Sequence, residues 1–232
     1  MVRLSTAQSG KALGICCVYV VVTVVGLVLW QYSVAYAVFY AVFSGIWVLL
    51  AAYIGLTLAE DLDFEPLPLV TNLKDVKKVG KWIGFTVIAF LLIFGAYKGI
   101  SMAAHHISTN ILGETFPSES FFETHYPGAS PFAAFFLIFA SAGIMGEVFF
   151  RLFALNLIWK LTKNAGIAIV VSSVIFSIYF LTPLNPKNEI MWGFPFYHLV
   201  VNTFAGIFLG YAYKKLGFES VVVVRTLMTF FG

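Results

Sequence analysis

Charged residues are scarce in this chain of 232 residues. Lysine, arginine, aspartate and glutamate make up 11% of it, whereas hydrophobic residues make up 60% and the mean hydropathy is +0.92. A soluble domain carries about 25% charged residues, so this chain has too little charge to cover a water-facing surface. The scarcity excludes a soluble enzyme and predicts an integral membrane protein embedded in a lipid bilayer. A net charge of +3 does not indicate binding to nucleic acid.

Cysteine and the common metal and nucleophile motifs are nearly absent. The two cysteines, Cys16 and Cys17, are adjacent in an apolar run, which excludes a disulfide framework. The sequence has no HExxH, CxxC or GxSxG pattern and no phosphate-binding glycine loop. The histidines and glutamates of the segment 104–131 lack a tight ligand spacing. We therefore expect neither a metal nor a cofactor.

Long apolar runs fill most of the chain. A membrane-spanning helix needs about 20 apolar residues. We expect six full spans and a short C-terminal seventh, near 12–30, 34–59, 82–103, 132–159, 167–183, 194–213 and 220–232. The sequence thus predicts an all-α, polytopic transmembrane helix bundle, built as a single membrane domain over 1–232. Residues 12–131 would supply the N-terminal spans and an outer loop, and residues 132–232 the remaining helical core.

The basic residues indicate an orientation in the membrane. If the predicted spans alternate, ten lysines and arginines fall on the same side: Arg3, Lys11, Lys74, Lys77, Lys78, Lys81, Lys160, Lys163, Lys214 and Lys215. The opposite loops contain only Lys187. Because cytoplasmic loops are enriched in lysine and arginine, we expect a cytoplasmic N-terminus and a loop 104–131 on the outer side of the cell membrane.

A glutamate and an arginine interrupt the fourth apolar run, in the segment GEVFFR at 146–151. Ionisable groups inside a membrane cost about 2.5–3.5 kcal/mol each on insertion scales and usually face a protein interior. Glu147 and Arg151 are four residues apart, so they share one face of a helix and are within reach of an ion pair. We interpret them as a structural ion pair.

Two further groups of polar residues lie in apolar runs. His198 and Asn202 repeat the spacing of four residues in the predicted sixth span, and they either form a local hydrogen-bonded network or hold a water, a metal or an oxyanion. Arg225 is expected to pair with backbone carbonyls or with Glu219.

Three sequence blocks then follow in a fixed order: GEVFFRLFALNLIWKL, AIVVSSVIFSIYFL and FAGIFLGYAYKKLGFES. Together they resemble the CPBP family, the CAAX prenyl protease and bacteriocin-processing proteins, also called Abi proteins. The family motifs are EExxxR, FxxxH, FxxGxxxG and a final HxxxN. Glu147, Phe150 and Arg151 match the first motif, Phe176 matches the start of the second, and Phe204–Gly210 matches the third. The resemblance covers about residues 132–230 and implies an intramembrane protease fold.

The resemblance also implies which positions would be catalytic. In the family, the first glutamate of EExxxR and the histidine of FxxxH activate a water, and the final histidine and asparagine stabilise an oxyanion. Here these first two positions are Gly146 and Phe180, and the final segment, VVVVRTLMTFF, has neither a histidine nor an asparagine. Peptide hydrolysis needs a positioned base and an oxyanion-stabilising group. We therefore expect no catalytic residues, and a pseudoprotease.

Three functions remain open at this point. The first is a scaffold or binding subunit of another membrane protein, for which a scaffold subunit of gamma-secretase with a similar fold is a precedent. The second is an intramembrane endopeptidase whose rearranged site uses Glu147, His198 and Asn202, with zinc as a possible cofactor. The third is a small transporter or lipid-binding protein. In all three, we expect Phe204, Gly206 and Gly210 to serve helix packing, because small residues four apart permit close approach.

Overall fold

The computed structural model describes residues 6–116, 126–185 and 191–232, and every regular element in these residues is a helix. In chain order the helices are α1 (Thr6–Leu29), α2 (Val34–Glu60), α3 (Pro68–Thr71), α4 (Val76–Asn110), α6 (Pro131–Ile138), the π-helices η1 (Phe139–Met145) and η2 (Val148–Leu155), α7 (Asn156–Thr162), α8 (Ala165–Tyr179), α10 (Pro195–Leu216) and α11 (Phe218–Phe231). The prediction of an all-α bundle is confirmed. The predicted outer loop lies partly outside the described residues.

Four of these helical stretches are long and apolar enough to cross a membrane. They are α1, α2, α4 and the continuous stretch Pro131–Thr162, and α8 is a shorter apolar helix. A helix is present at each of the seven predicted positions. The protein is thus a polytopic membrane protein, whereas the number of six full spans and a partial seventh stays a prediction.

Side-chain caps explain where several helices begin. Ser33 accepts a hydrogen bond from the Tyr36 N–H at the start of α2, and Asp75 accepts one from the Lys78 N–H at the start of α4. Asn164 accepts two, from the N–H groups of Gly166 and Ile167, at the start of α8. Such caps satisfy backbone donors that have no partner within the helix, so short polar turns divide the apolar runs.

The stretch Pro131–Thr162 departs from the α-helix assumed for it. Its middle is π-helical on both sides of Glu147, over Phe139–Met145 and Val148–Leu155. A π-helix forms hydrogen bonds between residues five apart, and it is frequent at functional sites. The local geometry around Gly146 and Glu147 is therefore wider than that of the neighbouring helices.

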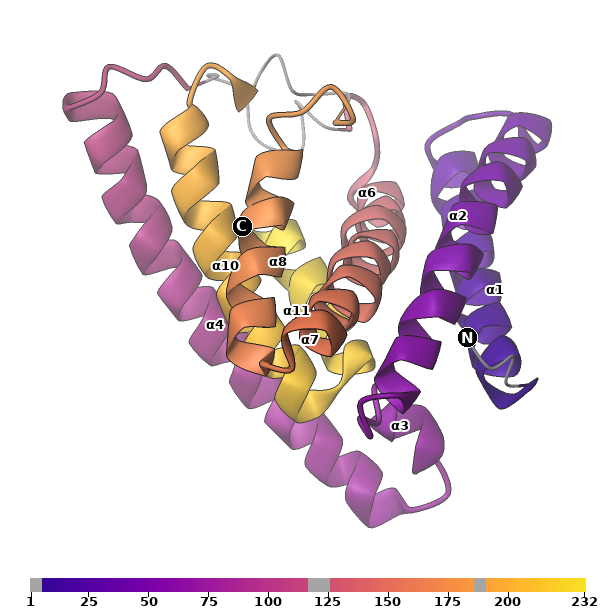
Figure 1. Ribbon diagram of the computed structural model, residues 1–232. Coiled ribbons are helices and arrows are strands. Elements are labelled where there is room, and N and C mark those ends of the chain that lie inside the picture. Colours follow the sequence, from indigo (N-terminus) through magenta and orange to yellow (C-terminus); the bar gives the residue numbers. More distant parts are fainter. Residues whose placement is uncertain (1–5, 117–125, 186–190) are drawn as a thin grey trace.

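The helices pack into one bundle, with α1 and α2 as a pair on one side and the long α4 slanting along the other (Figure 1). Between them, α10 contacts α4 and α8, while α11 contacts η1 and α4. The larger of two buried hydrophobic clusters includes residues from Ala12 of α1 to Met228 of α11. This packing brings η1, η2, α8, α10 and α11 around a common interior.

Glycine permits the closest of these helix contacts. A Cβ atom at Gly55 of α2 would overlap with the backbone carbonyl of Leu152 in η2. The absence of a side chain at this position lets α2 lie directly against η2, in the manner expected for small residues between membrane helices. This contact positions the helix that carries Glu147 and Arg151.

Candidate functional site: an apolar cavity beside a buried ion pair

Glu147 and Arg151 form an ion pair in the packed interior. Glu147 lies between η1 and η2, and Arg151 lies within η2. The Arg151 Nε is 3.3 Å from the Glu147 Oε2, and both side chains are almost fully buried. The guanidinium also lies over the ring of Phe176 from α8, with its Cζ atom 5.3 Å from the ring centroid. The pair neutralises two charges that would each be costly at this depth.

Hydrogen bonds contribute little to this pair. Within the described residues, neither the Glu147 carboxylate oxygens nor the Arg151 nitrogens have a well-aligned hydrogen-bond partner. A buried ion pair gains attraction in a low dielectric but loses the hydration of both ions, so removing one partner leaves a costly unpaired charge. The Glu147 carboxylate is therefore held by the Arg151 guanidinium.

A large cavity lies beside the pair. It has a volume of about 1190 Å³ and is lined by residues of α2, α4, η1, η2, α8, α10 and α11. Its wall includes Gly146, Phe180, His198 and Asn202, whereas neither Glu147 nor Arg151 is part of it. No aspartate or glutamate is present among the described residues of this wall. The described side chains of this wall thus offer no carboxylate base.

Gly146 leaves open space at this wall. A Cβ atom at Gly146 would meet only the Ser141 carbonyl oxygen, at an ordinary contact distance of 3.4 Å. Phe180, in contrast, fills its part of the wall with a ring that packs edge-to-face against Phe176, with centroids 5.2 Å apart. A hydrogen atom and a phenyl ring have no lone pair that could accept a proton from water.

His198 and Asn202 lie together on α10. The His198 Nδ1 is 3.4 Å from the Asn202 Nδ2. The imidazole is flanked by aromatic rings, parallel to Phe180 at 6.2 Å and tilted against Phe194 at 4.5 Å. Because Glu147 is absent from the cavity wall, the structure does not bring it onto a common surface with His198 and Asn202.

Arg225 is the residue of this cavity whose setting differs most from expectation. We expected it to pair with backbone carbonyls or with Glu219. Instead, its guanidinium lies over the Phe176 ring, with the Cζ atom 5.1 Å from the centroid, and Glu219 accepts a hydrogen bond from the Val70 N–H. Arg225 also lines the cavity wall. The Phe176 ring is thus in contact with two arginines, Arg151 and Arg225.

Residues 128–231 match the family model described as type II CAAX prenyl endopeptidase Rce1-like. This part of the chain is Rce1-like. The match is consistent with the CPBP family, and the predicted resemblance is confirmed at that level. A comparison with curated proteins and a comparison with solved structures each gave no match. The chain is therefore a membrane protein whose residues 128–231 are similar to CAAX proteases.

The Rce1-like region contains the positions that the resemblance implied to be catalytic. Gly146 and Phe180 both lie on the wall of the same cavity, although Gly146 follows η1 and Phe180 follows α8. The cavity thus occupies the place where the family motifs predict a hydrolytic centre. Glu147 and Arg151, the matching residues of the first motif, lie behind that wall in the packed interior.

The glycine motif of the Rce1-like region lies between α10 and α8. A Cβ atom at Gly206 would come within 2.7 Å of the Ser173 Cβ, and one at Gly210 within 3.0 Å of the Ile169 Cγ2. Phe204 is 45% exposed, and its part in helix packing stays a prediction. The two glycines let α8 approach α10 closely.

Sequence patterns did not reveal a polar contact between α2, α7 and α10. The Asn156 side chain is fully buried, and its Nδ2 donates to the Tyr213 hydroxyl at 2.8 Å and to the Gly55 carbonyl at 3.2 Å. Asn156 belongs to no recognised motif. The sequence could have indicated this contact only by the presence of a single asparagine in an apolar run, since buried amides generally form hydrogen bonds.

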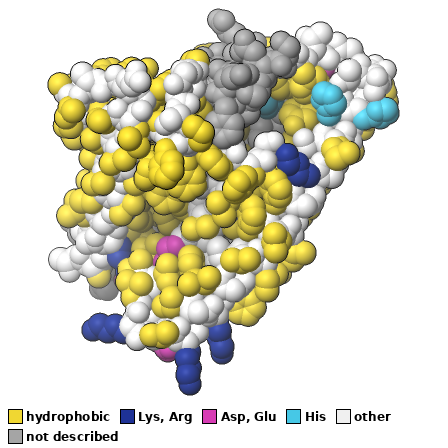
Figure 2. Space-filling model, turned by 180° about the vertical axis from the view of Figure 1, so that it is seen from behind, with side chains coloured by type: hydrophobic (Ala, Val, Ile, Leu, Met, Phe, Trp, Pro, Cys, Tyr) yellow, Lys and Arg dark blue, Asp and Glu magenta, His cyan; other side chains and the backbone are white. Residues whose placement is uncertain are grey.

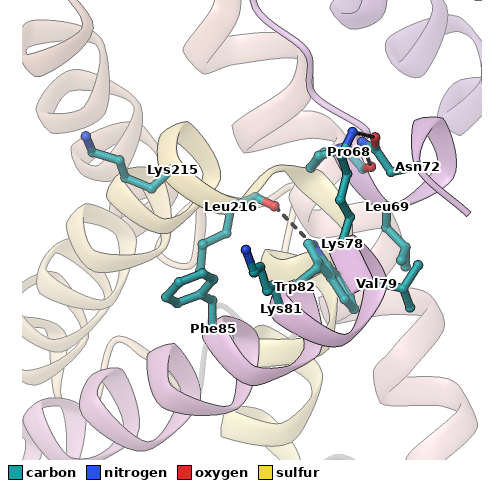
Figure 3. A pocket seen from close by; sticks show the side chains of 10 residues that line it. All are labelled: Pro68, Leu69, Asn72, Lys78, Val79, Lys81, Trp82, Phe85, Lys215 and Leu216. Carbon is teal, nitrogen blue, oxygen red and sulfur yellow. Dashed lines mark hydrogen bonds between the residues drawn. The ribbon is translucent and has the colours of Figure 1, made fainter. Parts of the chain in front are cut away.

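The basic residues gather at one end of the bundle. Figure 2 shows most of the visible lysines and arginines at one end and the histidines at the other. Lys11 pairs with Glu65, and Lys160 pairs with Asp61. Two lysines of α4, Lys78 and Lys81, and one of α10, Lys215, also line a smaller cavity of about 250 Å³. This cavity lies next to Trp82, whose Nε1 donates to the Leu216 carbonyl (Figure 3).

The histidines of the opposite end do not form a metal centre in the part of the chain that the structure describes. No group of three or more histidine, cysteine, aspartate or glutamate side chains is close enough there to hold an ion. His105 packs against Phe116, and the His106 Nδ1 is 2.8 Å from the Asn110 Nδ2. His125 lies outside the described residues.

Proposed function

We propose that this protein is a non-catalytic member of the CPBP family that acts as a scaffold or binding subunit of a membrane complex. The observation that carries the proposal is the cavity wall: Gly146 and Phe180 occupy the two positions expected to hold the base. Hydrolysis of a peptide requires an activated water and stabilisation of the oxyanion. Because Glu147 is held by Arg151 behind the wall, it does not replace the missing base.

A scaffold role agrees with the location of the buried charges, which pair with each other inside the bundle. The Glu147–Arg151 pair and the glycine contacts of α10 stabilise the bundle itself. The partner is proposed to be another membrane protein, because apolar side chains cover the outer faces of the long helices, with Phe39 of α2 and Leu92 of α4 about 70% exposed. Nothing in this role requires a metal or a cofactor.

The proposal also includes an orientation, with the N-terminus in the cytoplasm and the loop 104–131 outside. It is supported by the gathering of lysines at one end, since positive loops remain on the cytoplasmic side. A variant with Cys16 and Cys17 replaced by serine would carry one new cysteine, at Lys77 or at Thr115. In intact cells, a membrane-impermeant maleimide should label Thr115→Cys and spare Lys77→Cys. The reverse pattern would contradict the orientation alone.

Two measurements test the function itself. In the first, the purified protein is incubated with a prenylated CAAX-type reporter peptide, beside a His198→Ala variant. We expect equal, background-level product from both proteins. Product that disappears in His198→Ala or in Glu147→Gln would show a working protease with a rearranged site and would refute the proposal.

In the second measurement, the tagged protein is purified from its native membranes in a mild detergent, and its complex is weighed and identified by mass spectrometry. We expect a stoichiometric second membrane protein that a control membrane protein with the same tag does not retain. Isolation as a single chain without a partner would contradict the scaffold role, even if the first measurement found no hydrolysis.

A further inference from the structure

An unbalanced positive charge lies at the wall of the apolar cavity. In the described residues, the Glu147 carboxylate pairs with Arg151. Arg225 is a second guanidinium in this region, and it lines the cavity wall itself. Among the side chains that the structure describes on this wall, none carries a negative charge that would balance Arg225.

Arg225 has no carboxylate partner among the residues that the structure describes. None of the four ion pairs in this part of the chain includes Arg225. Its contact is the face of the Phe176 ring. A cation–π contact attracts the guanidinium but brings no negative charge to balance it.

The polar groups near Arg225 are suited to an anion. Arginine offers five N–H donors, and the same wall includes Asn202, Tyr97 and Tyr197. An amide and two hydroxyls are able to donate hydrogen bonds to a carboxylate or to a phosphate.

The rest of the wall is suited to a hydrocarbon chain. Six phenylalanines of the η2, α8 and α10 regions line it: Phe149, Phe150, Phe153, Phe176, Phe180 and Phe194. Small-molecule sites are usually about 300–1,000 Å³ in volume and mostly apolar. A cavity of about 1190 Å³ has room for a long apolar chain in addition to a polar head.

We infer that this cavity binds an amphiphile with a single apolar chain and an anionic head, and that the head lies on Arg225. The chain occupies the space between the phenylalanines of η2 and α8. The inference rests on the proposed function in one respect: the cavity holds its occupant without cleaving it. It does not depend on the membrane-protein partner of the scaffold role.

The test uses the full-length protein in a nonionic detergent and a fluorescent anthroyloxy stearate, displaced by three competitors that share one chain. Oleate carries a carboxylate, oleoyl lysophosphatidate carries a phosphate, and oleyl alcohol carries no charge. We expect at least one anionic competitor to bind about tenfold more tightly than the alcohol, since hydrogen bonds to charged groups are the stronger ones. The competitor with the higher affinity identifies the head group.

Variants assign this preference to Arg225. In Arg225→Gln the anionic competitor should lose about tenfold in affinity while the alcohol is unchanged, and Arg225→Lys should retain most of the preference. Lys214→Gln is the matched control, because it removes a positive charge that also lies over an aromatic ring, that of Trp159, but does not line this cavity. It should bind like the wild type.

A second variant tests the location of the chain. Gly146→Leu adds a side chain at a position with open space and should weaken all three competitors, with little change in thermal stability. Equal affinity for oleate, lysophosphatidate and alcohol would overturn the inference, and so would an Arg225→Gln variant that keeps the preference or a Gly146→Leu variant that binds normally. Cleavage of the reporter peptide would refute the proposed function while leaving these affinities to be judged separately.

Discussion

Arg151 approaches Glu147 through its Nε atom, at 3.3 Å from the Oε2, in a region from which water is almost completely excluded. The two residues occupy one helix, so the pair neutralises that helix before it packs against its neighbours. Arg225 of α11 adds a second positive charge nearby. This region therefore holds two guanidiniums and one carboxylate, which makes it electrostatically asymmetric.

This asymmetry predicts unequal effects of neutralising the two partners. Breaking a buried ion pair costs about 3–5 kcal/mol, and Glu147→Gln should reach the upper part of that range because it leaves two arginines. Arg151→Gln should cost less, because an unpaired buried carboxylate can take up a proton, whereas an unpaired guanidinium stays charged. The free energy of unfolding, measured by detergent-denaturant titration, checks the order. A double variant that is less destabilised than the sum of both changes is expected, and strict additivity would contradict direct pairing.

The contact between α10 and α8 predicts that Gly206→Ala is destabilising. The added Cβ would lie 2.7 Å from the Ser173 Cβ, and overpacking typically costs about 1–3 kcal/mol. Gly99→Ala in α4 is the matched control, because a Cβ there meets no atom within 4 Å. Thermal unfolding should show a lower midpoint for Gly206→Ala and an equal or higher one for Gly99→Ala. Equal midpoints in the two variants would contradict a tight contact between α8 and α10 at Gly206.

The buried amide of Asn156 predicts a graded pair of effects. Tyr213→Phe removes one hydrogen bond and should cost about 0.5–1.5 kcal/mol. Asn156→Ala should cost more, because it removes two hydrogen bonds and leaves the buried Tyr213 hydroxyl without this partner. Asn110→Ala, an exposed change on α4, serves as the control. If Asn156→Ala were as mild as this control, the contact would not stabilise the bundle.

Glu219 predicts a pH dependence at the basic end of the bundle. Burial is the main cause that raises the pKa of its carboxyl from 4.5 to about 7, against the lowering effect of the Val70 N–H. Because the folded protein binds the proton more tightly, the contribution is complete below about pH 4.5 and declines as the pH rises to about 7. Unfolding midpoints measured from pH 5 to pH 8 should fall more for the wild type than for Glu219→Gln. Parallel curves would refute this assignment.

Sequence reasoning recovered the helices because long apolar runs leave few alternatives in a membrane. It placed the turn around Asn164 and the pair of Glu147 with Arg151 by spacing alone. It did not predict the π-helical segments, since a hydrophobic pattern does not distinguish five-residue from four-residue hydrogen bonding. The position of Arg225 over Phe176 also depends on how α11 crosses α8, which is a tertiary relationship that no local pattern contains.

The π-helical turns before Gly146 have a consequence for insertions and deletions. A π turn amounts to an α turn with one residue added. Losing one residue from Phe139–Met145 would thus be absorbed by tightening a turn, and the segment beyond it would keep its rotation about the axis. In an ordinary α-helix such as α4, the same loss would rotate every later side chain by about 100 degrees. Among the helices that the structure describes, the stretch Pro131–Thr162 can therefore lose one residue while Glu147 and Arg151 keep their orientation toward the neighbouring helices.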